Sequence, residues 1–316
     1  MTAPARPRFV CMNRDFVPYE DAKVHVLSAA FKYAATVYEG IRAYWSDDTG
    51  DAPIFRLREH LERLQLSADL SRLPLPDSIE EIEARLVELI RRNELKQDMH
   101  IRIIAFVSAD DGLIDAVEPV DLMIATMPMG RYPEEVAGKT ALDVGISHWQ
   151  RLSDAAMPPR VKTSGNYVNS RLALLQARHS GYDDALLLDA RGKVTEGPGY
   201  NFFMVRRGEV VTPMVTQGIL EGITRETIIE LLAEVHGVQV VQREIDKTEV
   251  LVAEEAFFCG SGKEVRPIAS VDRHQLRRPA PGEMTRAIRD TYFDVVRGRR
   301  PEFGRWLTPV WKEPAP

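Results

Sequence analysis

Hydrophobic and polar residues alternate along this chain with two different periods. One is the two-residue period of β-strands, and the other is the 3.6-residue period of α-helices. Runs typical of β-strands lie at residues 10–13, 24–26, 37–44, 100–108 and 121–127. Residues 58–73 carry apolar side chains at helical spacing and end before Pro74. Ser78 and Glu81 form a capping-box pattern at the start of a second helix, whose apolar face reaches Ile90. The first part of the chain therefore predicts an α+β unit with two helices.

The second part of the chain mixes the same two periods. We expect strands at residues 185–189, 202–206, 209–212, 238–243 and 256–259. Helices are predicted at residues 169–180 and 283–297. A third helix is predicted to begin at Thr224, a suitable N-cap residue, and to end near Gly237. This part also has the pattern of an α+β domain.

A boundary between two domains is expected near the middle of the chain. At 316 residues the chain is long enough for two domains of ordinary size. Residues 128–139 contain two prolines and two glycines and follow neither period, so they predict an interdomain loop. We therefore expect a smaller N-terminal domain at residues 1–127 and a larger domain at residues 140–316.

The composition argues against several classes of function. The formal net charge is −6 and basic residues are scattered among acidic ones, so nucleic acid is not an expected partner. No run of about 18 apolar residues is present, and residues 1–8 lack the apolar core of a secretion signal. The two cysteines, Cys11 and Cys259, suit a reducing cytosol and do not suggest a metal site. We expect a cytoplasmic protein with no membrane partner and no metal.

Three short segments carry the candidate chemistry. Lys162 precedes a Ser-Gly-Asn turn, Glu196 precedes Gly197 at a strand end, and Gly222-Ile223-Thr224 opens a helix. A lysine can form a Schiff base, a carboxylate can pair with a pyridinium, and a helix N-terminus can bind phosphate. Taken alone, these features are ordinary: a surface lysine, a hairpin glutamate and a threonine cap. Together they indicate an enzyme that uses pyridoxal 5′-phosphate (PLP).

These segments belong to a longer series of motifs. The series is Val37-Tyr38-Glu39-Gly40-Ile41-Arg42, residues 55–64, residues 161–167, Glu196-Gly197, residues 222–225 and Gly260-Ser261-Gly262. The order resembles that of fold-type IV PLP enzymes, and most closely that of the branched-chain amino acid aminotransferases. This resemblance implies a two-domain α+β fold of the D-amino acid aminotransferase type, with a smaller N-terminal α/β domain, a larger C-terminal domain and PLP at the domain interface. It also implies a homodimer.

The resemblance implies a role for individual residues. Lys162 would form the Schiff base, Tyr167 would contact the ring hydroxyl, and Glu196 would pair with the pyridinium. The phosphate would be held by Arg63, Ile223, Thr224 and Ser261. The substrate would be bound by Tyr38, Gly40, Arg42, His100, Arg102 and Gly262. An ion pair with Glu59, four residues earlier, is the alternative for Arg63.

The substrate-binding motifs depart from those of the relatives in two places. His100-Ile101-Arg102 stands where the branched-chain enzymes usually have Tyr-x-Arg. A histidine can donate a hydrogen bond in place of the phenol and gains charge as the pH falls, or it can be a strand-edge residue with structural hydrogen bonds. We expect His100, Arg102 and Arg42 to form a cationic end of the pocket that selects carboxylate-bearing substrates. Met129 stands where the family often has Trp, which gives a softer pocket wall.

The resemblance implies an aminotransferase that moves the amino group of a branched-chain or other hydrophobic L-amino acid to 2-oxoglutarate or another keto acid. Two activities of the same fold stay open: transamination of D-amino acids or (R)-amines, and the elimination catalysed by aminodeoxychorismate lyase. Residues 196–201 resemble the (R)-amine enzymes, whereas Arg42 favours the branched-chain group. A non-catalytic ligand-binding protein that kept the fold is the alternative from another class.

Overall fold

The chain forms two compact units. The computed structural model describes residues 6–111, 113–130 and 138–312. Unit 1 consists of Met1–Gly130, Val161–Gly165 and Asp294–Pro316, and unit 2 consists of Arg131–Arg160 and Asn166–Phe293. Much of the expected interdomain loop, at residues 131–137, lies outside the described residues. The domain boundaries at 1–127 and 140–316 therefore stay a prediction.

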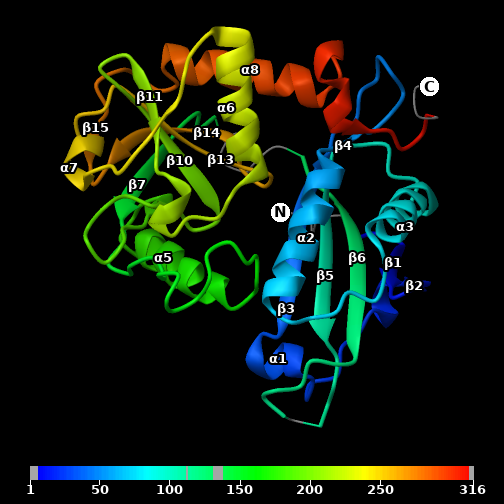
Figure 1. The fold of residues 1–316 in the computed structure, drawn as a ribbon. Coiled ribbons are helices and arrows are strands. Elements are labelled where there is room, and N and C mark those ends of the chain that lie inside the picture. The colour runs from blue at the N-terminus through cyan, green and yellow to red at the C-terminus, as the bar shows by residue number, and fades with distance from the viewer. Residues whose placement is uncertain (1–5, 112, 131–137, 313–316) are drawn as a thin grey trace. The chain divides into compact units, whose positions relative to one another are not determined.

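Unit 1 is built on a seven-stranded sheet with the order β16-β4-β3-β5-β6-β1-β2 (Figure 1). The strands are β1 (Phe9–Met12), β2 (Asp15–Pro18), β3 (Thr36–Ala43), β4 (Ile54–Phe55), β5 (Met99–Val107), β6 (Val120–Pro128) and β16 (Leu307–Thr308). All their pairings are antiparallel. Strands β1, β3, β5 and β6 confirm four of the predicted runs. The strand predicted at residues 24–26 is wrong: Val24 and Val26 are exposed and pair with no strand of the described chain.

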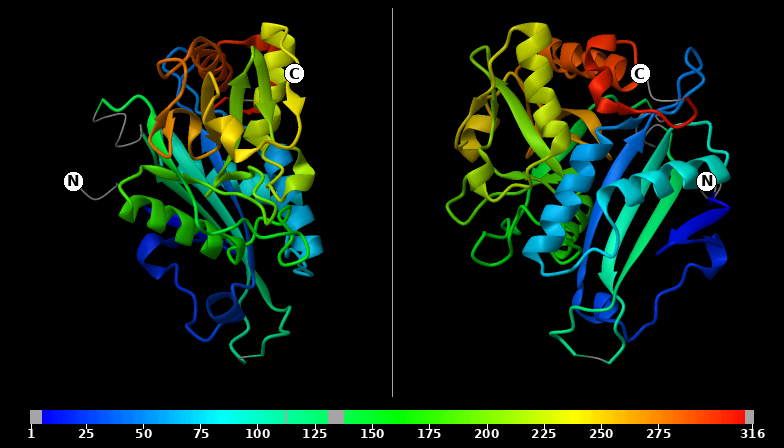
Figure 2. Two further views of the ribbon diagram at one scale, coloured as in Figure 1. Left: turned by 90° about the vertical axis from the view of Figure 1, so that its left-hand side faces the viewer. Right: turned by 45° about the vertical axis from the view of Figure 1, so that its right-hand side comes forward.

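Helices cover one face of this sheet. Unit 1 contains α1 (Ala29–Tyr33), α2 (Leu57–Leu70) and α3 (Ile79–Arg92), with 3₁₀ turns at Tyr19–Asp21 and Pro301–Trp306. Helix α2 packs on β3, and α3 packs on β1 and β6, as the right-hand view of Figure 2 shows. The predicted capping box is confirmed, because the Ser78 hydroxyl accepts from the Glu81 amide and the Glu81 carboxylate accepts from the Ser78 amide.

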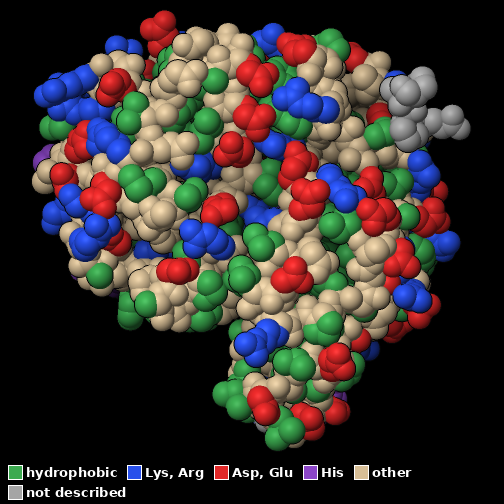
Figure 3. All heavy atoms as spheres, in the orientation of Figure 1, with side chains coloured by type: hydrophobic (Ala, Val, Ile, Leu, Met, Phe, Trp, Pro, Cys, Tyr) green, Lys and Arg blue, Asp and Glu red, His purple; other side chains and the backbone are tan. Residues whose placement is uncertain are grey.

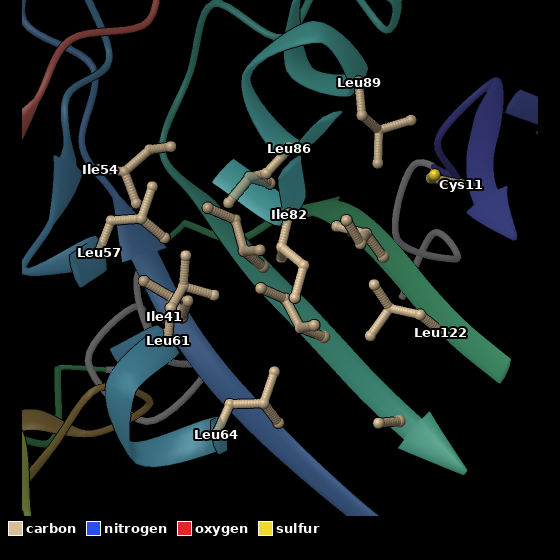
Figure 4. Packing of buried hydrophobic residues seen from close by; sticks show 14 of the residues in the cluster. Cys11, Ile41, Ile54, Leu57, Leu61, Leu64, Ile82, Leu86, Leu89 and Leu122 are labelled. Atoms are coloured by element: carbon tan, nitrogen blue, oxygen red, sulfur yellow. The ribbon is translucent and has the colours of Figure 1, made fainter. Parts of the chain in front are cut away.

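The core of unit 1 lies between these helices and the sheet. Leu61 and Leu64 from α2 and Leu86 from α3 point toward Ile41 and its neighbours (Figure 4), and all four are fully buried. Complete burial of one such side chain contributes about 1.5–3 kcal/mol. Because side chains alternate along a strand, burying Ile41 here turns its neighbours on β3 toward the opposite face. That opposite face carries the predicted substrate residues.

Unit 2 contains a nine-stranded sheet, with the path β12-β11-β10-β13-β14-β7-β8 and with β9 on β10 and β15 on β14. Its strands are β7 (Leu142–Ile146), β8 (Asp184–Leu186), β9 (Glu196–Gly197), β10 (Tyr200–Arg206), β11 (Glu209–Thr212), β12 (Val241–Gln242), β13 (Glu255–Gly260), β14 (Glu264–Val271) and β15 (His274–Gln275). Its helices are α5 (Asn166–His179), α6 (Ile223–His236), α7 (Lys247–Val250) and most of α8 (Glu283–Val296), with a 3₁₀ turn at Val215–Gln217.

Most predicted elements of unit 2 are confirmed, and two details are corrected. The run at residues 238–243 forms only the short strand β12. Helix α6 ends as expected at Gly237, whose φ of 66° is left-handed. Thr224 is not its N-cap: Gly222 is the cap, and the helix begins at Ile223. A glycine is needed at this cap because a Cβ there would collide with the Asn201 side chain.

The surface carries charges of both signs. On the face shown in Figure 3, Lys and Arg side chains lie among Asp and Glu side chains. Within the residues that the structure describes, no helix is both long enough and apolar enough to span a bilayer. The same residues contain no cluster of three or more His, Cys, Asp or Glu side chains placed to hold a metal ion.

Candidate active site

The predicted substrate residues of unit 1 share one face of the sheet. Gly40 on β3 is opposite Arg102 on β5, and Arg42 is opposite His100, so their side chains face the same side. A Cβ on Gly40 would lie 3.1 Å from His100 Nε2 and 3.8 Å from Arg102 Nη1. Glycine at this position therefore lets both long side chains of β5 lie across β3.

Two arginines and a lysine gather on this face around aromatic rings. The Arg102 guanidinium lies 4.8 Å from the centre of the Tyr38 ring, and Lys162 Nζ lies 4.9 Å from the same centre. Arg42 is buried, donates from Nη2 to the Met129 carbonyl at 3.1 Å, and lies over the Tyr44 ring at 5.1 Å. Three cations on one face, one buried and two half-buried, favour an anionic ligand.

His100 does not add charge to this group. Burial, reinforced by the positive charges of Arg102, Arg42 and Lys162, lowers the pKa of His100 to about 3. The imidazole is therefore neutral at ordinary pH, and the expectation that it gains charge as the pH falls fails above about pH 4. The strand-edge alternative is also wrong, because β5 pairs with β3 and with β6. The positive charges on this face are those of Arg42, Arg102 and Lys162, and His100 is a neutral polar group beside them.

The Lys162 segment is fixed against β3 by its backbone. The Tyr38 amide donates to the Lys162 carbonyl at 2.9 Å, and Val37 forms an isolated bridge with Thr163. The Lys162 amide donates to the hydroxyl of Ser67 on α2 at 3.2 Å. These contacts hold the main chain and leave the side chain to reach over the Tyr38 ring. The backbone of this irregular segment is therefore anchored to β3 and to α2.

Arg63 lies on α2, on the helix-covered side of β3. Its guanidinium forms an ion pair with Glu39, and the carboxylate of Glu39 also contacts His60. The alternative partner, Glu59, pairs instead with Arg56 at 2.7 Å. Sequence reasoning assigned no role to Glu39 or His60. The available signal was a carboxylate at an inward position of an otherwise apolar strand, where a charge needs a partner.

Glu196 in unit 2 is held by three hydrogen-bond donors that the sequence did not predict as site residues. Its side chain is buried and accepts from Arg151 Nε at 2.9 Å, from Asn201 Nδ2 at 3.1 Å and from the Leu220 amide at 3.1 Å. Three donors on one carboxylate stabilise its ionised form. No sequence pattern singled out Arg151, which acts from an irregular segment far from Glu196 along the chain.

The remaining unit 2 residues lie around the hairpin of β9 and β10. Asn201 also donates to the Leu220 carbonyl at 2.9 Å, which ties Glu196 to the segment that leads into α6. The ring of Tyr167, near the start of α5, lies 3.7 Å from the position of a Cβ on Gly199. Ser261 and Gly262 form the turn between β13 and β14. The start of α6, Ile223 and Thr224, follows the Gly222 cap directly.

Within each unit, the chemistry of these residues suits a part of PLP. Unit 1 supplies an amine at Lys162 and a guanidinium at Arg63. Unit 2 supplies an ionised carboxylate at Glu196 and a helix start that has no side-chain cap within the described residues. A helix N-terminus of this kind favours a phosphate, because its backbone N–H groups and its dipole present positive charge. The carboxylate of Glu196, paired with Arg151, is the kind of group that stabilises a protonated ring nitrogen.

Comparison with known proteins identifies the family. The sequence matches amino-transferase class IV over residues 36–271. A probable branched-chain-amino-acid aminotransferase of Aquifex aeolicus is 36% identical over 306 residues, which cover 96% of this chain and 97% of the relative. The branched-chain amino acid aminotransferase of Thermobaculum terrenum, solved in its PLP form, is 39% identical with a TM-score of 0.91, covering 97% of this chain and 99% of that chain.

A third relative was solved with a cofactor–substrate adduct. The T.th. branched-chain amino acid aminotransferase, complexed with N-(5′-phosphopyridoxyl)-L-glutamate, is 36% identical with a TM-score of 0.90 and covers 96% of this chain and 99% of that chain. The expected two-domain fold-type IV α+β architecture is confirmed by these matches. The chain therefore belongs to the class IV aminotransferase family and is an aminotransferase that uses PLP.

Proposed function

We propose that this enzyme transfers the amino group of a branched-chain or other hydrophobic L-amino acid to 2-oxoglutarate or another keto acid. The observation that carries the proposal is the placement of Arg42 and Arg102 on one face of the sheet. Lys162 lies over the ring of Tyr38, which Arg102 also contacts. This arrangement suits a substrate that brings a carboxylate close to its reacting amine. The names of the relatives and the glutamate adduct of one of them support the same substrate pair.

The residues of this chain divide the work of the reaction. Bound PLP supplies a protonated ring that accepts electron density when the substrate loses its α-proton. Lys162 would hold the cofactor through its side-chain amine, and the same amine would serve as the group that moves the proton of the substrate. Glu196, held by Arg151 and Asn201, keeps the ring nitrogen protonated. Arg63, Ile223, Thr224 and Ser261 hold the phosphate, and Tyr167 contacts the ring hydroxyl.

The remaining predicted residues bind the substrate. Arg42 and Arg102 bind its carboxylate, while Tyr38, Gly40, Gly262 and the neutral His100 shape the pocket around it. A transaminase for (R)-amines or D-amino acids is the second candidate, because residues 196–201 resemble those enzymes. Arg42 and Arg102 on one face favour an amino acid over a simple amine, since a guanidinium can bind the carboxylate that a simple amine lacks.

Replacing Arg102 with alanine tests this pocket end. We expect the Michaelis constants for L-leucine and 2-oxoglutarate to rise roughly ten- to hundredfold, because a hydrogen bond to a charged group contributes about 1.5–3 kcal/mol. The constant for (R)-1-phenylethylamine, which has no carboxylate, should change little. Steady-state kinetics with the three compounds give the answer. Unchanged constants for the amino acid and the keto acid would show that this end of the pocket has another role.

We propose that the enzyme is a homodimer formed through the face of the unit 1 sheet opposite α2 and α3. A hollow of about 570 Å³ on this face is lined by apolar side chains of β1, β5 and β6, among them Ile104, Phe106 and Met123. Phe31, which also lines it, is 74% exposed. A contiguous apolar surface of this kind marks an interface, and a second copy of the chain is the commonest partner.

Replacing Phe31 with aspartate tests the dimer. We expect the parent enzyme to sediment as a dimer and the variant to shift toward monomer, because a carboxylate in an apolar interface is left without a partner. Leu70→Asp, at an exposed leucine of α2, is the matched control and should leave the mass unchanged. A monomeric parent enzyme at micromolar concentration would contradict the proposal.

A cytoplasmic location is also proposed. Cys11 and Cys259 are both free and buried, as suits a protein of a reducing compartment. Burial raises the pKa of the Cys11 thiol, so this thiol stays protonated and unreactive. The domain boundaries at residues 1–127 and 140–316, with an interdomain loop at 128–139, remain part of this proposal.

A further inference from the structure

An ionic cluster with a fully buried carboxylate lies between β3 and α2 in unit 1. Glu39 projects from β3, on the side opposite the substrate residues, and meets His60 and Arg63 from α2. The side chain of Glu39 is 0% exposed and that of His60 is 2% exposed. A carboxylate at such depth needs several donors to be stable. The cluster is therefore a built feature of the core and not a surface ion pair.

The geometry of the cluster is that of a fork. Arg63 Nε donates to Glu39 Oε1 at 2.7 Å, and Arg63 Nη2 donates to Oε2 at 2.8 Å. His60 Nδ1 lies 2.7 Å from Oε2 and donates to it when it carries the proton. Two parallel bonds fix the plane of a guanidinium as well as its distance. The plane of the fork also fixes the direction of Nη1, the third nitrogen of Arg63.

The charges within the cluster are balanced. Burial alone would raise the pKa of Glu39, but the charge of Arg63 and the hydrogen bonds from His60 and Arg63 outweigh burial and hold the pKa well below its usual value. Burial lowers the pKa of His60 despite the adjacent carboxylate. One cation, one anion and one neutral ring give a net charge of zero. Arg63 therefore reaches a ligand with its charge already compensated.

The cluster is also connected to the catalytic lysine. Ser67, on the same helix as Arg63, accepts from the Lys162 amide. Glu39 is adjacent in β3 to Tyr38, whose amide donates to the Lys162 carbonyl. The strand and the helix that the cluster joins are thus the two elements that hold the lysine segment. A shift of α2 relative to β3 would displace Arg63 and Lys162 together.

We propose that Glu39, supported by His60, is a positioning residue that aims Arg63 at the cofactor phosphate, so that Arg63 acts as an oriented donor and not as a source of net charge. This inference rests on the proposed contact between Arg63 and the phosphate. Arg63 could favour phosphate binding through its net charge or through its fixed orientation, and the two possibilities predict opposite effects. If net charge dominates, removing the Glu39 charge strengthens phosphate binding. If orientation dominates, the same change weakens it.

The test is Glu39→Gln in the full-length enzyme. Apoenzyme is titrated with PLP to obtain the dissociation constant, and the ³¹P resonance of the bound cofactor is recorded. We expect the dissociation constant to rise about tenfold, because an amide cannot accept both bonds of the fork. The ³¹P resonance should shift or broaden as the arginine loses its fixed orientation. Glu59→Gln, which removes a carboxylate from the Arg56 ion pair on the same helix, should change neither quantity.

Arg63→Ala, alone and combined with Glu39→Gln, distinguishes a wrong phosphate contact from a wrong positioning role. If Arg63→Ala alone leaves the PLP dissociation constant unchanged, the proposed phosphate contact is wrong and this inference falls with it. If Arg63→Ala weakens binding but Glu39→Gln does not, only the positioning role is wrong. With a positioning role, adding Glu39→Gln to Arg63→Ala brings no further loss, because both changes remove one contact. Additive losses would show that Glu39 acts independently of Arg63.

His60 provides a second route should Glu39→Gln fail to fold. His60→Asn retains a donor toward Glu39, whereas His60→Leu removes it without adding charge. We expect His60→Leu to raise the PLP dissociation constant severalfold and His60→Asn to restore most of the affinity. Equal PLP dissociation constants for both variants and the parent would overturn the supporting role of His60. They would also show that the hydrogen bonds of Glu39 do not orient Arg63.

Discussion

Replacing Lys162 with alanine is expected to abolish transamination and to leave the fold intact. The side-chain amine both binds the cofactor and carries the proton, and these roles together account for several orders of magnitude in rate. The fold should survive because the backbone hydrogen bonds of this segment, to Tyr38 and Ser67, do not involve the lysine side chain. Turnover of L-leucine with 2-oxoglutarate and the thermal midpoint of the variant measure the two effects.

Treatment with borohydride tests the role of Lys162 independently of turnover. The parent enzyme should show an absorption band near the visible edge that borohydride abolishes while fixing the cofactor to Lys162, and mass spectrometry of the peptide locates the added mass. Lys193→Ala, which breaks a surface pair with Asp246, is the control and should retain both the label and the activity. Near-normal turnover in Lys162→Ala, or a label on another lysine, would remove Lys162 from the catalytic role.

Glu196→Gln should retain the cofactor and slow the proton transfer by roughly two orders of magnitude. An amide cannot hold a proton on the ring nitrogen as a carboxylate does. It also places an NH₂ group against Arg151, Asn201 or the Leu220 amide, all of which donate to Glu196. Single-turnover rates with L-leucine, measured across the pH range, and the bound PLP content report the rate and the retention separately.

The control for this variant is Glu209→Gln, at an exposed position on β11. It should leave the rates unchanged. A Glu196→Gln enzyme whose single-turnover rates match the parent at every pH would mean that another group protonates the ring. Loss of the cofactor itself would instead place Glu196 in the binding of PLP and not in its activation.

The sequence predicted the elements whose periodicity is undisturbed. On β5, Ile101 and Ile103 alternate with His100 and Arg102, and the structure buries the first pair and gathers the second. The period-2 pattern thus carried information about the strand and about its chemistry. Helix α3 was predictable for the same reason, since its capping box and apolar face are local features.

Other features could not be predicted from the sequence, because they depend on the tertiary structure. Strand β14 was not predicted because Arg266 and Pro267 interrupt its apolar pattern, although Arg266 is 1% exposed in the structure. The run around Val24 and Val26 had strand-like residues but no neighbouring strand within the described chain. Arg151 could not be recognised, because a loop arginine carries no periodicity and its partner is distant in sequence. In all three cases, contacts between residues distant in sequence decide the outcome, either by their presence or by their absence.

The electrostatics of the site were the least predictable part. The sequence predicted His100 beside two arginines. It could not show that burial has the largest effect on the pKa of His100 and lowers it. Glu39 carried a usable signal, an acidic residue in an inward position between Val37 and Ile41. Its partners could be found only when α2 was placed on β3.

A donor panel tests the proposed reaction most directly. Purified enzyme is assayed with L-leucine, L-valine, D-alanine and (R)-1-phenylethylamine, each with 2-oxoglutarate and with pyruvate, and kcat/KM is measured for every pair. The arginine-lined pocket predicts that L-leucine and L-valine with 2-oxoglutarate give the highest values. Equal or higher values for (R)-1-phenylethylamine or D-alanine would contradict it and would make the (R)-amine or D-amino acid transaminase the better description.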